Sequence, residues 1–258
     1  MRVPLHIVEA RRERLRSLIR HDGFLPLGEI CRRLDISEAT ARRDLAAIEA
    51  DGQITRTYGG ALADYNASFA SLGEREKRAR SAKARIARVA AHLAPIRGTV
   101  FLDAGTTVLA LARALARRRH QQLTVVTNGL AIASVLGGAH GITLHLLGGV
   151  FLNRLSMLFG DHAVGALDKW NFDAVFLGGE AMNADGVFNS HPETVRLHHA
   201  VLTRTEAAYF CIDATKLGRT TPHYVTVWGT AYHLITDAPP AQLRAEGITL
   251  KKPQLHCA

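Results

Sequence analysis

Small and polar residues follow the first apolar run beyond residue 99, and their types suit the binding of a phosphate group. Asp103 ends that run, and Gly105, Thr106 and Thr107 follow at the start of a helical stretch. Backbone N–H groups at the positive end of a helix, together with threonine hydroxyls, donate hydrogen bonds to a phosphate. The spacing matches neither a Gly-x-Gly-x-x-Gly loop nor a Walker loop, so only the residue types indicate this chemistry.

The same pattern returns after later apolar runs. The small or polar residues that follow them include Thr127, Asn128, Gly148, Gly149, Gly178 and Lys216. Lys216 suits a phosphate or sugar acid, whereas Asp103 and Asn128 suit sugar hydroxyls. Turn and cap formation explains any one of these residues equally well, and Asp213 with Lys216 fits a local cap beside a surface lysine. Repetition at several strand ends favours one shared ligand pocket.

The apolar runs that carry these residues alternate with helical stretches. Strands are expected at 100–103, 123–127, 142–147, 174–177, 207–212, 224–227 and 234–236. Alternation of this kind is typical of an α/β domain with a mainly parallel sheet and helices on both faces. Ligands of such sheets bind beyond the carboxyl ends of the strands, which is where the polar residues are expected.

A second group of residues that could do chemistry lies in the stretch 34–45. The hydroxyl of Ser37 is expected to cap a helix, and Glu38 places a negative charge in its positive first turn. Leu45 and Ile48 give that helix a buried face. The remaining surface offers groups suited to contact with DNA, namely Ser37, Glu38, Thr40, Arg42 and Arg43.

Two further helices and a β-wing are expected around this stretch. Amphipathic helices are predicted over about 8–21 and from Pro26 onwards, ahead of a short turn. The segment 53–61 alternates β-forming residues and ends in glycines, which is typical of a wing. Its Arg56 and Tyr58 are candidates for contact with phosphate or the adjacent groove. The order predicts a winged helix-turn-helix whose third helix enters a major groove.

A plainer interpretation of the arginines also stands. Arg42 and Arg43 fit a solvated helix face, paired with Glu38, Asp44 or Glu49. Taken alone, a charge cluster on a helix favours that interpretation. The agreement of helix, turn, capped helix and wing within one short segment favours DNA binding.

The segment 13–61 resembles the N-terminal domain of the DeoR family of bacterial transcriptional regulators. The family pattern is Val-Ser-x-x-Thr-Ile-Arg-Arg-Asp-Leu, followed by Arg-x-His/Tyr-Gly-Gly-Ala. Ile36 and Ala41 depart from it, and the apolar volume lost at Ala41 is expected to loosen or tilt the helix slightly. The matching residues are Ser37, Thr40, Arg42, Arg43, Asp44, Leu45, Arg56, Gly59, Gly60 and Ala61.

The strand-end loops resemble the effector-sensing domain of the same family. The resemblance implies a fold related to ribose-5-phosphate isomerases, glucosamine-6-phosphate deaminases and CoA transferases. It is weakest between 183 and 205, where His191, His198 and His199 lie. The matching pieces are 102–107, 126–128, 147–149, Asp173 with Phe176, Asp213 with Lys216, and 236–237.

The chain is expected to divide into a DNA-binding domain, a polar linker and an effector-sensing and oligomerisation domain, at 1–61, 62–73 and 74–258. A helix with many basic residues is expected over 74–93. By resemblance to the family, its Arg75 and Lys83 are candidates for effector contact. A solvated helix face explains its charges equally well.

Composition limits the class of protein. A net charge of +9 and a pI near 9.9 favour polyanionic partners such as double-stranded DNA. Cys31, Cys211 and Cys257 are too few and too widely spaced for a disulfide framework, which suits the cytoplasm. No apolar run reaches the length of a signal peptide or membrane span. His198 and His199 are adjacent and cannot both face one ion from a regular helix, so neither metal nor cofactor is expected.

The leading hypothesis is a ligand-controlled transcriptional repressor rather than an enzyme. A phosphorylated sugar or related metabolite is expected to change how a homo-oligomer, either dimer or tetramer, meets the operator DNA of a carbohydrate operon. The runner-up is an active sugar-phosphate isomerase or deaminase that carries a DNA-binding module, with Asp103, Glu180 or Asp213 as its base. A basic architectural protein would leave the strand-end loops without a role.

Overall fold

The computed structural model divides into two compact units, Met1–Ser71 and Leu72–Ala258. It describes residues 4–57, 60–63, 69–229, 231–251 and 254–258. The boundary falls inside the stretch 62–73 predicted as a linker. Both ends of that stretch are structured, because β3 (Gly60–Ala63) runs into it and α4 (Leu72–Lys77) begins before it ends. The predicted linker is therefore too long at both ends.

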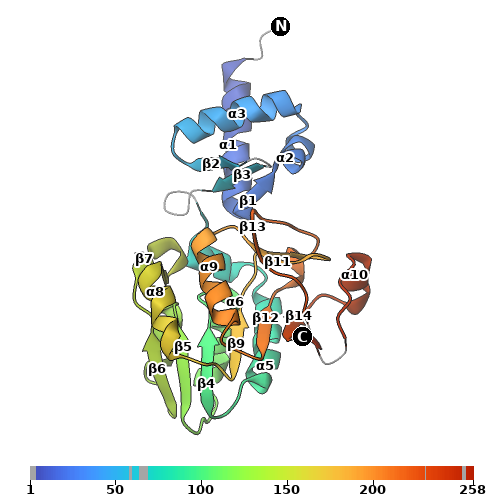
Figure 1. Ribbon diagram of the computed structural model, residues 1–258. Coiled ribbons are helices and arrows are strands. Elements are labelled where there is room, and N and C mark those ends of the chain that lie inside the picture. Colours follow the sequence, from blue (N-terminus) through green and yellow to red (C-terminus); the bar gives the residue numbers. More distant parts are fainter. Residues whose placement is uncertain (1–3, 58–59, 64–68, 230, 252–253) are drawn as a thin grey trace. The chain divides into compact units, whose positions relative to one another are not determined.

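The first unit is a winged helix-turn-helix, as the sequence predicts (Figure 1). Its strands form an antiparallel sheet in the order β1-β3-β2, and the first of them was not expected. The other elements are α1 (Leu5–Asp22), β1 (Phe24–Pro26), α2 (Leu27–Leu34), α3 (Glu38–Ala50) and β2 (Ile54–Thr57). All three helices contribute to the core, through Leu15, Ile19, Ile30, Ala41, Leu45 and Ile48.

Local sequence explains several boundaries of these elements. Gly23 follows α1 with a φ of 79°, a left-handed conformation that glycine adopts without a Cβ penalty. Pro26 precedes α2, where the missing N–H group costs nothing. Gly60 allows β3 to approach β1, because a Cβ there would lie 2.3 Å from the backbone oxygen of Leu25.

The second unit contains a seven-stranded sheet in which every neighbouring pair is parallel. The strand order is β15-β14-β12-β9-β4-β5-β6. This arrangement confirms the predicted mainly parallel α/β fold. The strands are β4 (Gly98–Leu102), β5 (Leu123–Thr127), β6 (Ile142–Leu146), β9 (Ala174–Leu177), β12 (Ala208–Cys211), β14 (Tyr232–Thr236) and β15 (Leu255–Cys257).

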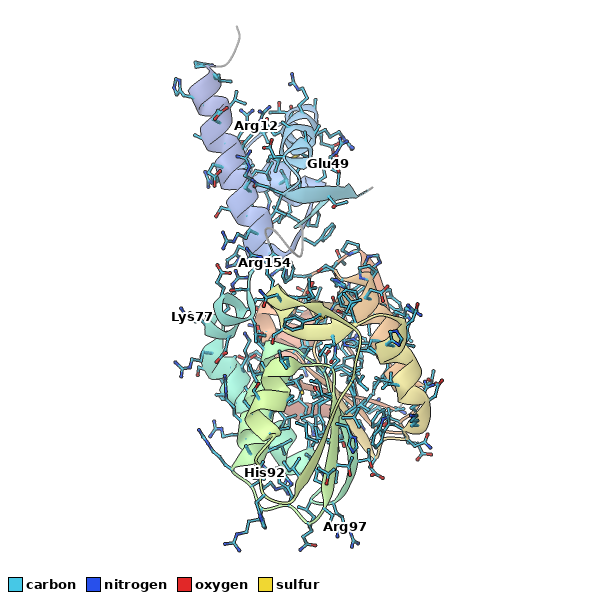
Figure 2. The ribbon with its side chains drawn as sticks, turned by 90° about the vertical axis from the view of Figure 1, so that its left-hand side faces the viewer. Arg12, Glu49, Lys77, His92, Arg97 and Arg154 are labelled. Carbon is cyan, nitrogen blue, oxygen red and sulfur yellow. The ribbon has the colours of Figure 1, made fainter. Side chains whose placement is uncertain are left out.

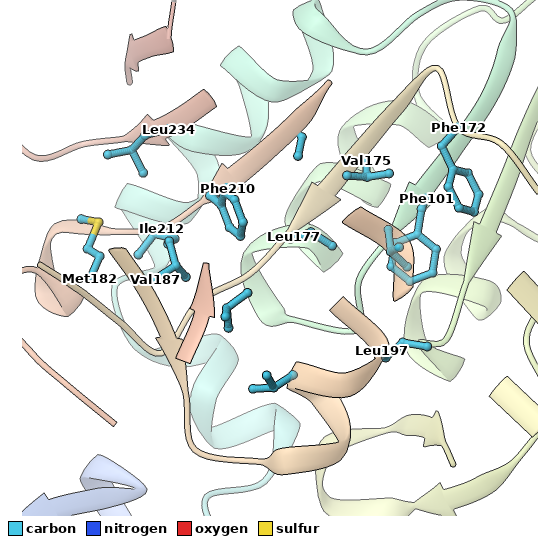
Figure 3. Close-up of a cluster of buried hydrophobic side chains, with 14 of the residues drawn as sticks. Phe101, Phe172, Val175, Leu177, Met182, Val187, Leu197, Phe210, Ile212 and Leu234 are labelled. Carbon is cyan, nitrogen blue, oxygen red and sulfur yellow. The ribbon is translucent and has the colours of Figure 1, made fainter. Parts of the chain in front are cut away.

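Helices cover both faces of this sheet, and successive side chains of each strand point to opposite faces. Val100 and Leu102 of β4 pack in a first apolar cluster on one face, and Phe101 packs in a second cluster on the other face. Figure 3 shows the second cluster, in which the ring centroids of Phe101 and Phe172 lie 5.7 Å apart. The first cluster includes α5 (Arg80–Leu93), α6 (Thr106–Ala116) and α7 (Leu130–Leu136), and the second includes α8 (Asp161–Ala166) and α9 (Pro192–Leu202).

Parts of the second unit differ from the expected strands. The run predicted at 224–227 forms β13 (His223–Thr226), which pairs antiparallel with β11 (Gly186–Asn189) outside the main sheet. Neither β15 nor the hairpin of β7 (Val150–Leu152) and β8 (Met157–Phe159) was expected. Strands of three residues are too short to show a period-two pattern.

The remaining elements of the described residues are short. None of the helices within the described residues is long and apolar enough to cross a membrane. The elements are β10 (Ala181–Asn183), α10 (Pro240–Ala245) and 3-10 helices at Asn153–Leu155, Leu167–Lys169 and Ala214–Lys216.

The basic helix expected over 74–93 is interrupted. α4 and α5 are separate helices, because Ala79 takes a left-handed backbone conformation with a φ of 49°. Lys83 Nζ stabilises the break by donating hydrogen bonds to the backbone oxygens of Arg75 and Arg78, at 2.6 and 2.7 Å. The residues around the break are good helix formers, so local propensity does not predict the interruption.

Candidate DNA-reading surface and effector site

Ser37 caps α3 as predicted. Its Oγ accepts a hydrogen bond from the N–H of Thr40 at 3.3 Å. Glu38 lies in the first turn of the helix, where a negative charge stabilises the positive helix end. Ala41 is fully buried on the opposite face. The looser helix expected from its small side chain stays a prediction.

The surface of α3 that faces away from the core carries exposed arginines. Arg42 Nη2 lies 3.3 Å from Glu38 Oε2, and the two side chains are 61% and 65% exposed. Arg43 donates to the backbone oxygen of Ala39 at 3.2 Å, and its Nη2 lies 3.5 Å from Thr40 Oγ1. Exposed ion pairs contribute about 0–1 kcal/mol. Both guanidinium groups can therefore exchange these contacts for DNA at little cost.

Asp44 has a role in this helix that the sequence analysis missed. It is buried, and its carboxylate oxygens lie 2.6 Å from Arg11 Nε and 3.1 Å from Arg12 Nε of α1. It therefore fixes α3 to α1, whereas one of the predicted pairings placed it beside Arg42 or Arg43. The sequence feature that could have shown this role is the helical spacing of Asp44 from Ala41 and Ile48, which places Asp44 on the buried face of α3.

The wing is joined to the end of α3 through Arg56. The N–H of Arg56 donates to Glu49 Oε1 at 2.8 Å, and its guanidinium Nε lies 2.5 Å from Glu49 Oε2. The Arg56 side chain stays 47% exposed, so it can also reach a phosphate. Tyr58 lies outside the described residues. Contact of either residue with DNA stays a prediction.

The carboxyl ends of β4 and β9 meet at the topological switch point of the main sheet. From β4 the chain proceeds through β5 to β6 at one edge, and then returns to β9 and proceeds towards the other edge. Connections that leave neighbouring strands in opposite directions leave room for a ligand between them. Asp103 follows β4 directly and Gly178 follows β9 directly, so the two residues share this point.

Asp103 is a buried carboxylate held from two sides. Its Oδ2 accepts a hydrogen bond from the N–H of Gly178 at 3.1 Å, and its Oδ1 lies 3.2 Å from His198 Nε2. Burial alone would raise the pKa of Asp103, but the charge of His198 and the hydrogen bonds outweigh burial and hold the pKa below its ordinary value. The sequence analysis did not identify this role of His198. The signal was its spacing from Val195 and Val201, which places it on the buried face of α9.

Gly105 and Gly178 lie close against the Asp103 carboxylate. A Cβ at these positions would lie 3.4 and 3.2 Å from Asp103 Oδ2. Thr106 and Thr107 are buried in the first turn of α6, which begins directly after Gly105. The structure therefore brings five of the predicted effector residues, namely Asp103, Gly105, Thr106, Thr107 and Gly178, to the neighbouring ends of β4 and β9.

Thr127 and Asn128 are buried braces between strand ends. Thr127 Oγ1 donates to the backbone oxygen of Leu102 at 2.6 Å and accepts from the N–H of Gly129 at 3.0 Å. Asn128 Oδ1 accepts from the N–H of Ala104 at 3.1 Å, and its Nδ2 donates to the backbone of β8. These bonds occupy both side chains, so they position the loop after β4, whereas the sequence predicted direct effector contact.

Gly148 and Gly149 lie in the exposed loop between β6 and β7. Gly149 has a φ of 131°, and a Cβ there would lie 2.3 Å from the backbone oxygen of Phe159. Glycine at this position therefore serves the β7–β8 hairpin. A contact of either glycine with the effector stays a prediction.

Basic groups gather at the carboxyl end of β12. Lys216 is half-buried, and burial lowers its pKa, although the Asp213 carboxylate opposes this effect and Arg219 adds to it. Burial also lowers the pKa of Lys83 to about 8, opposed by Asp213 and reinforced by Lys216 and Arg75. Positive charges that repel one another in a partly desolvated place attract a phosphate dianion.

Two acidic residues border this basic cluster. Asp213 caps the following 3-10 helix by accepting from the N–H of Thr215 at 3.1 Å, so the predicted local cap is confirmed. Glu180 raises the pKa of Lys216 and also accepts from the N–H of Ser190 at 3.1 Å. The loop 178–180 therefore connects the surroundings of Asp103 with those of Lys216.

The other histidines of the unmatched segment have local partners. The ring of His191 meets Phe159 edge-on, with centroids 5.5 Å apart. His199 Nε2 lies 2.8 Å from the backbone oxygen of Val225. Within the described ranges, no group of three or more His, Cys, Asp or Glu side chains is arranged to hold a metal ion.

Comparison with known proteins matches both units to one family. The family model of the DeoR C terminal sensor domain matches residues 78–238. The family model of the DeoR-like helix-turn-helix domain matches residues 11–66. Among solved structures, ribose 5-phosphate isomerase A from Methanocaldococcus jannaschii has a TM-score of 0.39 and 13% identity, covering 54% of each chain. A similarity this distant carries over no activity.

Three curated relatives are transcriptional repressors. The putative aga operon transcriptional repressor of Escherichia coli O157:H7 is 30% identical, covering 83% of this chain and 81% of its own. The lactose phosphotransferase system repressor of Lactococcus lactis subsp. lactis is 31% identical, covering 81% and 83%. The HTH-type transcriptional repressor GlcR of Bacillus subtilis (strain 168) is 30% identical, covering 91% and 90%. With both units matched and these identities over most of its length, the chain belongs to the DeoR family of helix-turn-helix transcriptional regulators.

Proposed function

We propose that this regulator is a repressor of a carbohydrate operon and that its second unit, the sensor unit, binds a phosphorylated sugar or a related metabolite. The observation that carries the proposal is the buried Asp103 at the switch point of the sheet, with the basic groups of Lys83 and Lys216 at a nearby strand end. A carboxylate suits hydroxyl groups and the lysines suit a phosphate. The repressor names of the relatives support the carbohydrate operon.

In this proposal the two units act through a coupling free energy. The exposed residues of α3 read the operator in the major groove, and Arg56 adds a contact from the wing. The effector contacts Asp103, Lys83 and Lys216, with the start of α6 contributing donors to it. Binding that differs between two conformations of the sensor unit changes the affinity for DNA. Recognition of paired half-sites requires a homo-oligomer. The proposed place of action is the cytoplasm.

The runner-up, an active sugar-phosphate isomerase or deaminase, has less support. Each carboxylate suggested as its base already has an internal partner, which suits a fixed binding group better than a base that must take up a proton. Asp103 is held by Gly178 and His198, Glu180 by Ser190, and Asp213 by Thr215. None of the relatives reported above is named as an enzyme. A regulator without turnover therefore remains the proposal.

Arg43→Ala is expected to weaken operator binding by about 1–3 kcal/mol, because the variant loses a guanidinium that contacts a base edge. If Arg43 contacts a phosphate instead, the loss is uniform across sequences and the salt dependence becomes flatter. Fluorescence anisotropy with operator and scrambled duplexes at several salt concentrations measures both effects. Arg244→Ala removes the same charge from the exposed surface of α10 and should bind like the wild type. Unchanged binding by Arg43→Ala would contradict the groove assignment.

A panel of sugar phosphates and sugar acids should contain compounds that raise the melting temperature of the protein, because a ligand that binds the folded state alone stabilises it. Lys216→Ala is expected to reduce that rise strongly without lowering the melting temperature of the free protein much, since the lysine is only half-buried. The matched control is Lys169→Ala, which changes an exposed lysine at the end of the 3-10 helix Leu167–Lys169. A full response in Lys216→Ala would remove Lys216 from the site.

Effector binding is expected to take up protons at pH 8.5 but not at pH 6.5. The pKa of Lys83 is about 8 in the free protein, so part of the population is neutral at pH 8.5, and a bound phosphate dianion favours the charged form. The phosphate itself is already dianionic there, because its second pKa is about 6. Calorimetric titrations in two buffers of different ionisation enthalpy measure the uptake. Equal enthalpies in both buffers, or the same uptake in Lys83→Met, would refute this role.

A further inference from the structure

A long stretch of the sensor unit carries no charged side chain. Charged residues make up 21% of the chain, yet no Asp, Glu, Lys or Arg occurs from 120 to 153. This stretch contains β5, α7, β6 and β7. Figure 2 views the molecule from the side on which β6 lies and labels Arg154, the first charged residue after the stretch. The net charge of +9 therefore comes entirely from residues elsewhere.

Strand β6 forms an unprotected edge of the main sheet. It pairs regularly with β5 over five residues, from Ile142 to Leu146, and no strand of the described residues pairs with its other side. Free sheet edges in proteins are usually protected by lysine, proline, a bulge or a covering element, because their unpaired N–H and C=O groups attract other strands. β6 contains neither lysine nor proline, so neither of these residues protects the edge.

Exposed apolar side chains lie in the segments joined to the carboxyl end of β6. Leu130, Leu146, Val150 and Phe151 are 40%, 40%, 61% and 46% exposed. Hydrogen bonds join the segments that carry them, from the N–H of Leu147 to Thr127 at 2.8 Å and from the N–H of Leu130 to Ser156 at 2.9 Å. β6 and these four side chains are called the uncharged edge below.

We propose that the uncharged edge is the surface through which a second copy of this chain binds. Two chains that each carry a net charge of +9 repel one another, and the repulsion is weakest where neither presents a charge. The buried centres of protein interfaces are depleted of charged residues for the same physical reason. The inference needs no effector, but it rests on the proposed repressor function, which requires a homo-oligomer, and adds the surface that forms it.

A second copy fits this edge better than a different partner. A twofold axis places β6 antiparallel to its own copy, so the free backbone groups of both edges are satisfied at once. The same operation brings the apolar side chains of one copy against the uncharged edge of the other. The paired recognition helices of a repressor require this kind of closed symmetry.

The mass of the protein in solution tests the proposal. Sedimentation equilibrium of the full chain at about 20 µM should give at least twice the 28.1 kDa of one chain. The double variant Val150→Glu, Phe151→Glu should give one chain mass. Its dissociation constant should rise at least about 100-fold, because each copy would bury two carboxylates in an interface that excludes water. Val227→Glu changes a side chain that is 59% exposed on a different part of the unit and should keep the wild-type mass.

A second variant tests the strand itself. Leu146→Pro removes an N–H group that points away from β5, because in this parallel pair the next N–H, that of Leu147, is the one that donates to Thr127. This variant should also give one chain mass, with the far-ultraviolet circular dichroism of the wild type. A wild-type protein that stays at one chain mass overturns the proposal, and so do variants that keep the wild-type mass. Failure of the repressor function would instead appear as missing operator binding by the wild type, which leaves these masses unchanged.

Discussion

Asp44→Ala is expected to destabilise the DNA-reading unit by about 3 kcal/mol and to abolish operator binding at physiological temperature. The variant leaves Arg11 and Arg12 without the buried carboxylate that joins α3 to α1. Breaking a buried pair by removing one partner costs about 3–5 kcal/mol, and the partial exposure of the arginines favours the lower end. In a unit of this size, about 1 kcal/mol shifts the melting temperature by roughly 4–8 °C, so calorimetry of the full chain measures the effect directly.

The matched control for this prediction is Asp51→Ala. Asp51 also pairs with an arginine of α1, since its carboxylate lies 2.7 Å from Arg16 Nη2, but its side chain is 50% exposed. An exposed pair contributes about 0–1 kcal/mol, so this variant should melt within a few degrees of the wild type. An equal decrease in melting temperature in the two variants would show that burial of Asp44 does not strengthen its ion pairs.

Asp103→Asn is expected to weaken effector binding by at least about 100-fold at pH 7. Asparagine still accepts the hydrogen bond from Gly178, but it removes the negative charge beside His198. The buried His198 also loses the carboxylate oxygen that lies 3.2 Å from its Nε2, so the variant should unfold at lower urea concentration. Titration calorimetry with the best ligand of the thermal-shift panel measures the affinity. Wild-type affinity in the variant would exclude Asp103 from the effector site.

The same substitution should change how stability depends on pH. The pKa of Asp103 in the folded protein lies below its ordinary value, so the unfolded chain binds the proton more readily. Its contribution to stability is therefore complete above the unfolded pKa of about 3.9 and is lost as the pH falls through the folded pKa. Asp103→Asn should consequently lose less stability than the wild type between pH 5 and pH 3. The control Asp185→Asn changes a loop carboxylate and should follow the wild-type curve.

The sequence predicted most of the architecture because the main features follow local rules. The hydroxyl of Ser37 predicted the start of α3, and apolar runs that alternate with helical stretches predicted six strands of the parallel sheet. The polar strand ends were also predicted, since residues such as Asp103 come directly after buried strands, whereas the strand order that makes a switch point was not. The fold prediction needed only patterns that span a few neighbouring residues.

The parts that were missed depend on contacts between distant residues. His198 lies far along the chain from Asp103, and nothing in its own neighbourhood identifies its partner. Asp44 resembles any charged residue of an exposed helix until α1 is placed against it. Thr127 and Asn128 have side chains suited to a ligand, and only the positions of adjacent loops show that other backbone groups already bind them.

The interruption between α4 and α5 carries a backbone cost that the side chain of Lys83 offsets. A left-handed alanine such as Ala79 costs roughly 1–2 kcal/mol relative to a helical one. The two hydrogen bonds donated by Lys83 return about 0.5–1.5 kcal/mol each. The broken form therefore depends on the ammonium group of Lys83, which is also proposed to contact the effector. This group lies close in the chain to the first residues that follow the DNA-reading unit.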